Sequence, residues 1–162
     1  MMEDLLISLS AFAALLPSAL VAVNRRTTGR GEEGRDATYW LTLAVAVAGP
    51  LVWVVLKMSD SWHTGLSTTL WVTIAASMVI FAAIVVLNDM AWRLTPLMTP
   101  YMALLAIIAI IWSQAPEGRP LGGAPGGWIQ AHILVSVATY ALVTIAAVSA
   151  LAAFLQERAL KT

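Results

Sequence analysis

Hydrophobic residues run along this chain in five long blocks that contain no charged side chain. The blocks are residues 5–24, 37–56, 61–88, 94–116 and 120–156. A helix of about 20 mostly apolar residues crosses a hydrocarbon core about 30 Å thick, and every block is long enough for one. The pattern predicts helices at about 5–23, 39–57, 66–87, 95–112 and 128–155. We therefore expect an all-α fold, a polytopic transmembrane bundle of five helices in which residues 1–162 form a single domain.

Composition excludes several classes of protein. Hydrophobic residues make up 60% of the chain, which rules out a soluble globular domain. The net charge is zero, so nothing indicates a nucleic-acid partner, and we expect none. There is no cysteine, which excludes disulfides, thiolate nucleophiles, cysteine-ligated metals and covalently attached c-type haem. The predicted helix cores contain no charged residue and the chain carries no HExxH, G-x-S-x-G or P-loop motif, so we expect that it is not an enzyme.

The distribution of basic residues predicts the orientation, because cytoplasmic loops of membrane proteins are enriched in Lys and Arg. With the N-terminus outside, two basic residues fall on the outer side, Lys57 and Arg119. The inner side then holds seven, namely Arg25, Arg26, Arg30, Arg35, Arg93, Arg158 and Lys161. This asymmetry predicts an N-out, C-in topology.

Two histidines are the candidate metal ligands, and the predicted topology puts both toward the outer side. His132 belongs to a stripe at four-residue spacing on the last helix: Trp128, His132, Ser136, Tyr140 and Thr144. We expect this stripe to face protein rather than lipid. A neutral imidazole at this depth is suited to ligate haem iron, and it is equally suited to a hydrogen bond between helices. His63 precedes the third helix, in a loop where an imidazole is usually solvated.

The last helix also carries a resemblance to a known family. The segment WIQAHILVSVATYALVTIAAVSALAAFLQERALK contains His132, Tyr140 eight residues later and an alanine-rich stretch, and Gln156-Glu157-Arg158 lie near its end. It resembles the cytochrome c assembly proteins of the CcsA type, in particular their shorter YpjD-like branch. The proline-led stretch 92–112 is also similar to that family. The resemblance is specific over roughly 92–161 and loose over 1–91.

The resemblance implies a haem-handling protein of the bacterial inner (plasma) membrane. It would hold haem b at the outer side and assist cytochrome c biogenesis, with His132 as an axial ligand of the iron and Trp128 and Tyr140 as walls of the pocket. The family's second ligand and its W-G-x-x-W-x-W-D segment follow later helices, and this chain contains no such motif. By this resemblance the chain corresponds to the first five of about eight helices, an incomplete family domain.

The implied partners are haem, membrane lipid, and either other cytochrome c biogenesis proteins or the missing C-terminal helices. The alternative, a different class of function, is a structural or assembly subunit of a membrane complex without haem.

The topology can be tested with single cysteines, since the natural chain has none. Cysteines introduced at Gly31 and Gly122 should react with a membrane-impermeant thiol reagent from opposite sides, Gly122 from outside. Labelling of both positions from one side would overturn the predicted number of helices between them.

Overall fold

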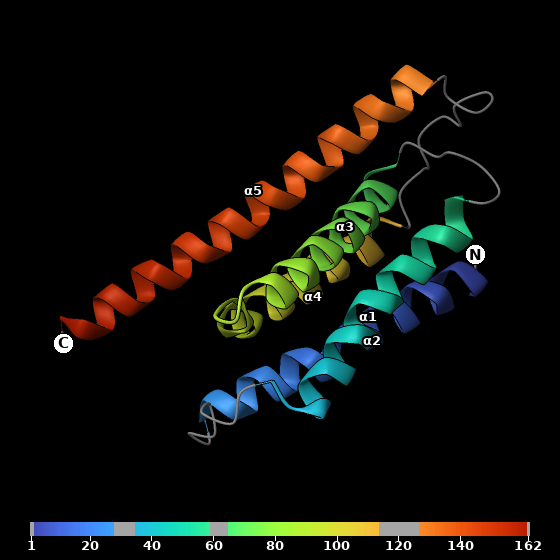
Figure 1. Ribbon diagram of the computed structural model, residues 1–162. Coiled ribbons are helices and arrows are strands. Elements are labelled where there is room, and N and C mark those ends of the chain that lie inside the picture. Colours follow the sequence, from blue (N-terminus) through green and yellow to red (C-terminus); the bar gives the residue numbers. More distant parts are fainter. Residues whose placement is uncertain (1, 28–34, 59–64, 114–126, 162) are drawn as a thin grey trace.

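The computed structural model describes residues 2–27, 35–58, 65–113 and 127–161 (Figure 1). Within these ranges the secondary structure is helical. The elements are α1 (Met2–Thr27), α2 (Ala37–Met58), α3 (Leu66–Leu87), the short 3-10 helix η2 (Ala91–Leu94), α4 (Thr95–Trp112) and α5 (Gly127–Leu160). In this described part, five helices are long and apolar enough to cross a membrane, as expected for a multi-pass membrane protein. The prediction of an all-α fold with five such helices is confirmed.

The helix ends differ from the predicted ones where charged residues flank an apolar block. The third and fourth helices have the predicted bounds, but α1 starts at Met2 and continues to Thr27, and α5 continues to Leu160. Charges end the apolar span without ending the helix, because Glu, Gln, Arg and Lys are good helix formers. At the end of α5, Lys161 Nζ also donates to Glu157 Oε1 at 2.9 Å. Arg30, His63 and Arg119 lie outside the described residues.

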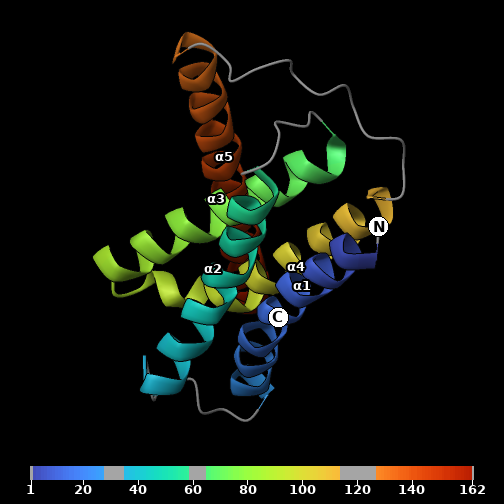
Figure 2. The same ribbon diagram turned by 90° about the vertical axis from the view of Figure 1, so that its right-hand side faces the viewer.

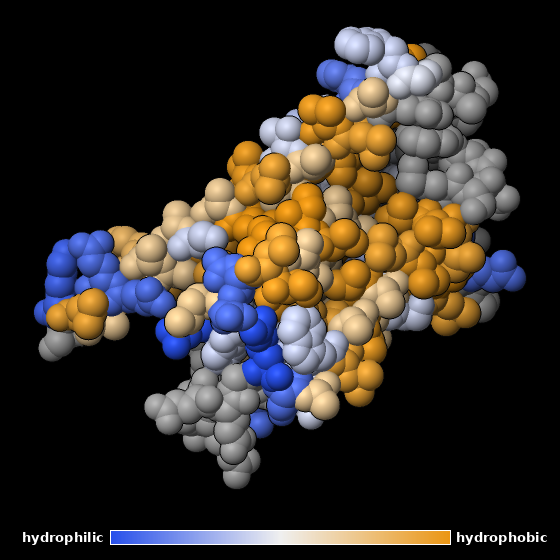
Figure 3. Space-filling view, in the orientation of Figure 1, coloured by the Kyte–Doolittle hydropathy of each residue, from blue (hydrophilic) through white to orange (hydrophobic). Residues whose placement is uncertain are grey.

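The first four helices form a closed ring, and α5 lies outside it. Within the ring α1 packs against α2 and α4, while α3 packs against α2 and α4 from the other side. The fifth helix packs mainly along α3, and Figure 1 shows it set apart from α1. In Figure 2 the start of α5 stands at the top, well away from the start of α1. The surface visible in Figure 3 is apolar over its middle and hydrophilic toward its ends, as a bilayer-spanning bundle requires.

Helices α1 and α2 come unusually close at Gly49. A Cβ placed on Gly49 would lie 2.4 Å from Ala14 Cβ and 3.2 Å from the carbonyl oxygen of Ala11. No real Cβ tolerates the shorter distance, so the missing side chain is what permits this approach. Ala11 and Ala46 are buried at the same interface. Small residues at helix crossings are the usual route to tight packing in a membrane, where burial from water contributes no attraction between helices.

The interior of the ring is built on aromatic and methionine side chains. Trp71, Phe81, Met78, Met98 and Met102 from α3 and α4 are fully buried.

Trp53 of α2 stacks on Trp71 of α3 with ring centroids 5.2 Å apart and planes inclined by 23°. Its indole Nε1 also donates to Ser8 Oγ of α1 at 2.9 Å. One side chain therefore connects three helices.

Polar contacts tie the helices together at both ends of the bundle. At one end Lys57 pairs with Asp4, and Ser67 Oγ donates to the carbonyl of Ala109 at 2.8 Å. At the other end Arg35 forms an ion pair with Asp89 and donates to the carbonyl of Val85 at 3.0 Å. Near the second end, the hydroxyl groups of Tyr39 and Thr95 lie 3.0 Å apart, linking α2 to α4.

The approach at Gly49 yields a stability prediction. Gly49→Ala should lower the thermal unfolding midpoint of the detergent-solubilised protein, by the equivalent of about 1–3 kcal/mol for an overpacked contact. Alanine is a better helix former than glycine by about 0.5–1 kcal/mol. A lower midpoint would therefore mean that the steric cost at this contact exceeds the gain in helix propensity.

Gly65→Ala is the matched control, because the nearest atom to a Cβ there is Thr68 Oγ1 at 3.9 Å. It should lower the midpoint by less than Gly49→Ala does, because its only cost is that alanine is a poorer N-cap than glycine for α3. An unfolding midpoint for Gly49→Ala equal to or above the wild-type value would contradict the close contact.

Candidate functional site

The fifth helix contacts the rest of the bundle through one narrow face. Its buried side chains are Ala141, Ile145, Val148 and Ala152, at spacings of four, three and four residues. This spacing follows the helical repeat and marks a single stripe, which lies against α3. The other described side chains of α5 are exposed or half-buried.

His132 lies on the opposite side of α5 from that stripe. Nine residues separate it from Ala141, and nine steps of about 100° amount to two and a half turns. Its side chain is exposed, as are Trp128 at 86% and Tyr140 at 63% of their full accessible areas. The expectation that these side chains face protein is not met within the described chain. The face of α5 that packs against α3 is the opposite one, which carries small and branched residues.

Near His132, side-chain hydroxyl groups of α5 donate to backbone carbonyls of the preceding turn. Ser136 Oγ donates to the carbonyl of His132 at 2.8 Å, and Thr139 Oγ1 donates to the carbonyl of Val135 at 2.8 Å. The imidazole of His132 has no hydrogen-bond partner among the side chains that the structure describes. The hydrogen bond to another helix, which the sequence left open as an alternative, is therefore not formed within this part of the chain.

His132 is near the end of the bundle that holds Asp4 and Lys57. Gln156, 24 residues further along α5, lines a cavity together with Thr95 and Tyr39 at the other end. At 1.5 Å per residue, His132 lies about 36 Å from Gln156 along the helix axis. The candidate ligand and this cavity are thus separated by roughly the thickness of a membrane.

These residues fit one side of a haem. His132 offers an accessible ring nitrogen, and Trp128, one turn earlier, offers an aromatic surface on nearly the same side of α5. A closed pocket requires a second wall and usually a second axial ligand. The described ranges supply neither beside His132, and they contain no group of three His, Asp or Glu residues placed to hold a metal ion. His63, the other candidate, lies outside them.

Sequence reasoning missed the cavity at the opposite end. Its lining includes Ser18, Tyr39, Arg93 and Thr95, which come from three different helices and the short η2 element. Tyr39 and Thr95 are 56 positions apart, and single apolar helices with scattered hydroxyl groups give no signal of such a meeting. Arg93 is the one member that stands out in the sequence, as the basic residue of the short turn between α3 and α4.

Comparison with known proteins gives one informative match. The chain is 49% identical over 162 residues to a protein of Azospirillum brasilense described as "Uncharacterized 28.8 kDa protein in nifR3-like 5'region". The match covers 100% of this chain and 59% of that protein, so the chain spans about three fifths of its relative's length. No family model and no solved structure matches.

The uncovered face of α5 predicts an association with another polypeptide or with a second copy of the chain. A photoreactive amino acid at Tyr140 should crosslink the protein to that partner in membranes. The same group at Val86 of α3, which is equally exposed at 63%, should give adducts with lipid only. Identical crosslinking patterns at both positions would contradict a partner on α5.

Proposed function

We propose that this protein is an integral membrane haem-handling protein that assists cytochrome c biogenesis. In this proposal α5 holds one side of a haem near the outer surface of the bacterial inner membrane, with His132 as an axial ligand. The observation that carries the proposal is the exposed imidazole of His132, which has no hydrogen-bond partner in the described chain. An idle polar group on a membrane helix is costly, so such a group commonly has a function.

The orientation proposed is N-out, C-in. It is supported by the inner-side excess of basic residues in the sequence and by the grouping of the described ones. Arg93 lines a cavity with Gln156 near the end of α5, and Arg35 and Asp89 pair at that end, whereas Lys57 lies at the other end beside Asp4. His132 then belongs to the outer half.

The chemistry proposed for these residues is binding and positioning, not catalysis. A bound haem would supply an iron with a free coordination position and a flat apolar surface. The neutral ring nitrogen of His132 would donate its lone pair to the iron. Trp128 would cover one part of the porphyrin face, and Tyr140, two turns further along α5, would mark the inner limit of the site. The bond from Ser136 to the carbonyl of His132 engages the hydroxyl and leaves the imidazole available.

The second candidate is a structural or assembly subunit of a membrane complex without haem. It is favoured by the low burial of α5, 17% against 28–39% for the other four candidate membrane spans, which leaves Leu134, Val135, Leu142 and Val143 largely exposed. A partner helix packed there would bury these side chains. The two functions are separated by whether haem accompanies the protein when its partner is present.

The haem proposal predicts a specific effect of one substitution. His132→Ala should abolish or strongly reduce the haem that co-purifies with the protein and its partners, measured by absorption after extraction into pyridine and alkali. Because His132 is exposed, the substitution should leave the thermal unfolding midpoint in the absence of haem unchanged. Imidazole in the medium should restore part of the binding, since it can enter the vacated coordination position.

His63→Ala is the control, since it removes the other histidine of the chain. It should retain most of the haem. Unchanged haem content in His132→Ala would assign His132 a structural role and favour the subunit without haem.

A further inference from the structure

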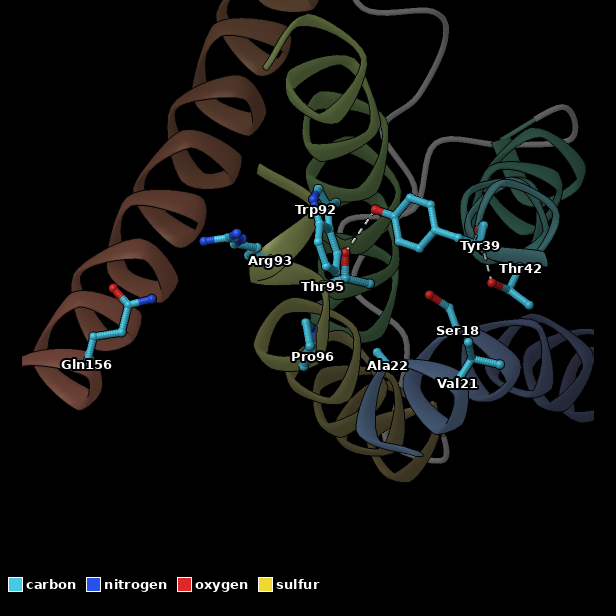
Figure 4. A pocket seen from close by; sticks show the side chains of 10 residues that line it. All are labelled: Ser18, Val21, Ala22, Tyr39, Thr42, Trp92, Arg93, Thr95, Pro96 and Gln156. Atoms are coloured by element: carbon cyan, nitrogen blue, oxygen red, sulfur yellow. Dashed lines mark hydrogen bonds between the residues drawn. The ribbon is translucent and has the colours of Figure 1, made fainter. Parts of the chain in front are cut away.

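The cavity at the end of the bundle where α5 finishes lies close to the polar boundary of the membrane. Its volume is about 270 Å³, and side chains from α1, α2, η2, α4 and α5 line it (Figure 4). On α4 it begins at Thr95, only two residues after the charged Arg93. On α1 it reaches Ser18, six residues or about 9 Å along the helix from the polar Asn24. The cavity therefore extends from the boundary into the hydrocarbon depth of the bundle.

The lining of this cavity is suited to water. Six of its ten residues carry a hydroxyl, amide or guanidinium group, namely Ser18, Tyr39, Thr42, Arg93, Thr95 and Gln156. Arg93 and Gln156 are exposed, whereas Ser18 and Thr95 are each 2% exposed, so the polar lining runs from the surface to the interior. A buried water needs about 10–15 Å³ and two to four polar partners, and the volume admits several.

Helix α1 is bent where it borders the cavity. Pro17 lies inside α1, and Figure 2 shows this helix changing direction near its middle. A proline has no N–H to donate to the carbonyl four residues earlier, and its ring clashes with that carbonyl, so it bends a helix. The α1 residues that line the cavity, Ser18, Val21 and Ala22, all follow Pro17 within five positions. The bend and the cavity therefore belong to the same part of α1.

Pro17 contributes direction rather than packing. Its side chain is exposed, whereas the next two residues, Ser18 and Ala19, are buried. An alanine at position 17 would lose no core contact and would restore the helical hydrogen bond to the carbonyl of Ala13. The ring of Pro17 thus acts on the structure mainly through the path of the second half of α1.

We propose that the bend at Pro17 holds open a water-filled vestibule on the side of the membrane that carries Arg93. A straight α1 would continue beside α4 and bring Ser18 against Thr95 and Pro96, which would close the space. In the bent helix, water solvates hydroxyl groups that would otherwise face hydrocarbon at a cost. The fully buried aromatic and methionine side chains of the ring interior end the vestibule, so water and small polar solutes enter from one side without crossing the bundle.

Cysteine reactivity tests whether water reaches Ser18, because methanethiosulfonates react with the thiolate, which forms in water rather than in hydrocarbon. The natural chain has no cysteine to interfere. In membrane vesicles, Ser18→Cys should react with 2-sulfonatoethyl methanethiosulfonate roughly tenfold faster than Leu20→Cys or Ser77→Cys. Leu20 is 68% exposed on the same helix and two residues nearer the boundary, so it reports access through lipid. Ser77 is fully buried and does not line the cavity.

A second substitution in the Ser18→Cys protein tests the bend. Pro17→Ala should lower the labelling rate roughly tenfold, since a straighter α1 closes the vestibule. Pro50→Ala is the matched control, because it removes a proline from inside α2 about 12 Å along the helix from Thr42. It should leave the rate nearly unchanged. Unfolding would expose the cysteine and raise the rate, so a lower rate cannot reflect loss of structure.

The side of entry is tested with Arg158→Cys, which marks the end of α5. Ser18→Cys and Arg158→Cys should be labelled from the same side of the membrane, whichever side that is.

Three results would overturn the proposal. If Ser18→Cys reacts no faster than Leu20→Cys, the cavity does not hold water. Equal rates with and without Pro17→Ala would mean that the bend does not keep it open. Labelling of Ser18→Cys only from the side opposite to Arg158→Cys would place the opening at the other end of the bundle.

Discussion

The contact between Gly49 and the alanines of α1 is the constraint on which the rest of the bundle depends. A bilayer offers no hydrophobic force to hold helices together, so close packing must do so. With Ala14 Cβ only 2.4 Å from where a Gly49 Cβ would lie, α1 and α2 approach as nearly as backbones can. That approach brings Trp53 of α2 within hydrogen-bonding distance of Ser8 of α1, while the same indole stacks on Trp71 of α3.

Some polar groups of the bundle form ion pairs near its ends, and others have no hydrogen-bond partner among the described residues. The ion pairs Lys57–Asp4 and Arg35–Asp89 join successive helices at opposite ends, where water and headgroups reduce the cost of a charge. Among the described residues, the imidazole of His132 has no hydrogen-bond partner, and neither do the buried polar atoms of the Ser18, Trp71 and Ser77 side chains. Of these groups, His132 lies on the exposed face of α5, where we propose that it ligates haem.

Sequence periodicity and charge predicted the elements well and their contacts poorly. The predicted bounds of α3 and α4 match the structure, because a short turn separates the two apolar blocks. The direction of His132 could not be predicted, since which face of α5 packs on α3 depends on Ala141 and Ile145 meeting a helix formed some 60 residues earlier. The cavity was equally hidden, because Ser18, Tyr39 and Thr95 look like isolated hydroxyl groups until the ring closes.

The exposed face of α5 underlies both proposals for that helix, since a haem site with one wall requires a partner to complete it. The most direct measurement is the optical absorption spectrum of the protein isolated from its native membranes together with the partner crosslinked to α5. Haem handling predicts an intense Soret band that shifts when dithionite reduces the iron, with haem extractable by acid because no cysteine anchors it. A folded, partner-bound protein whose spectrum contains only the protein absorption would contradict the account.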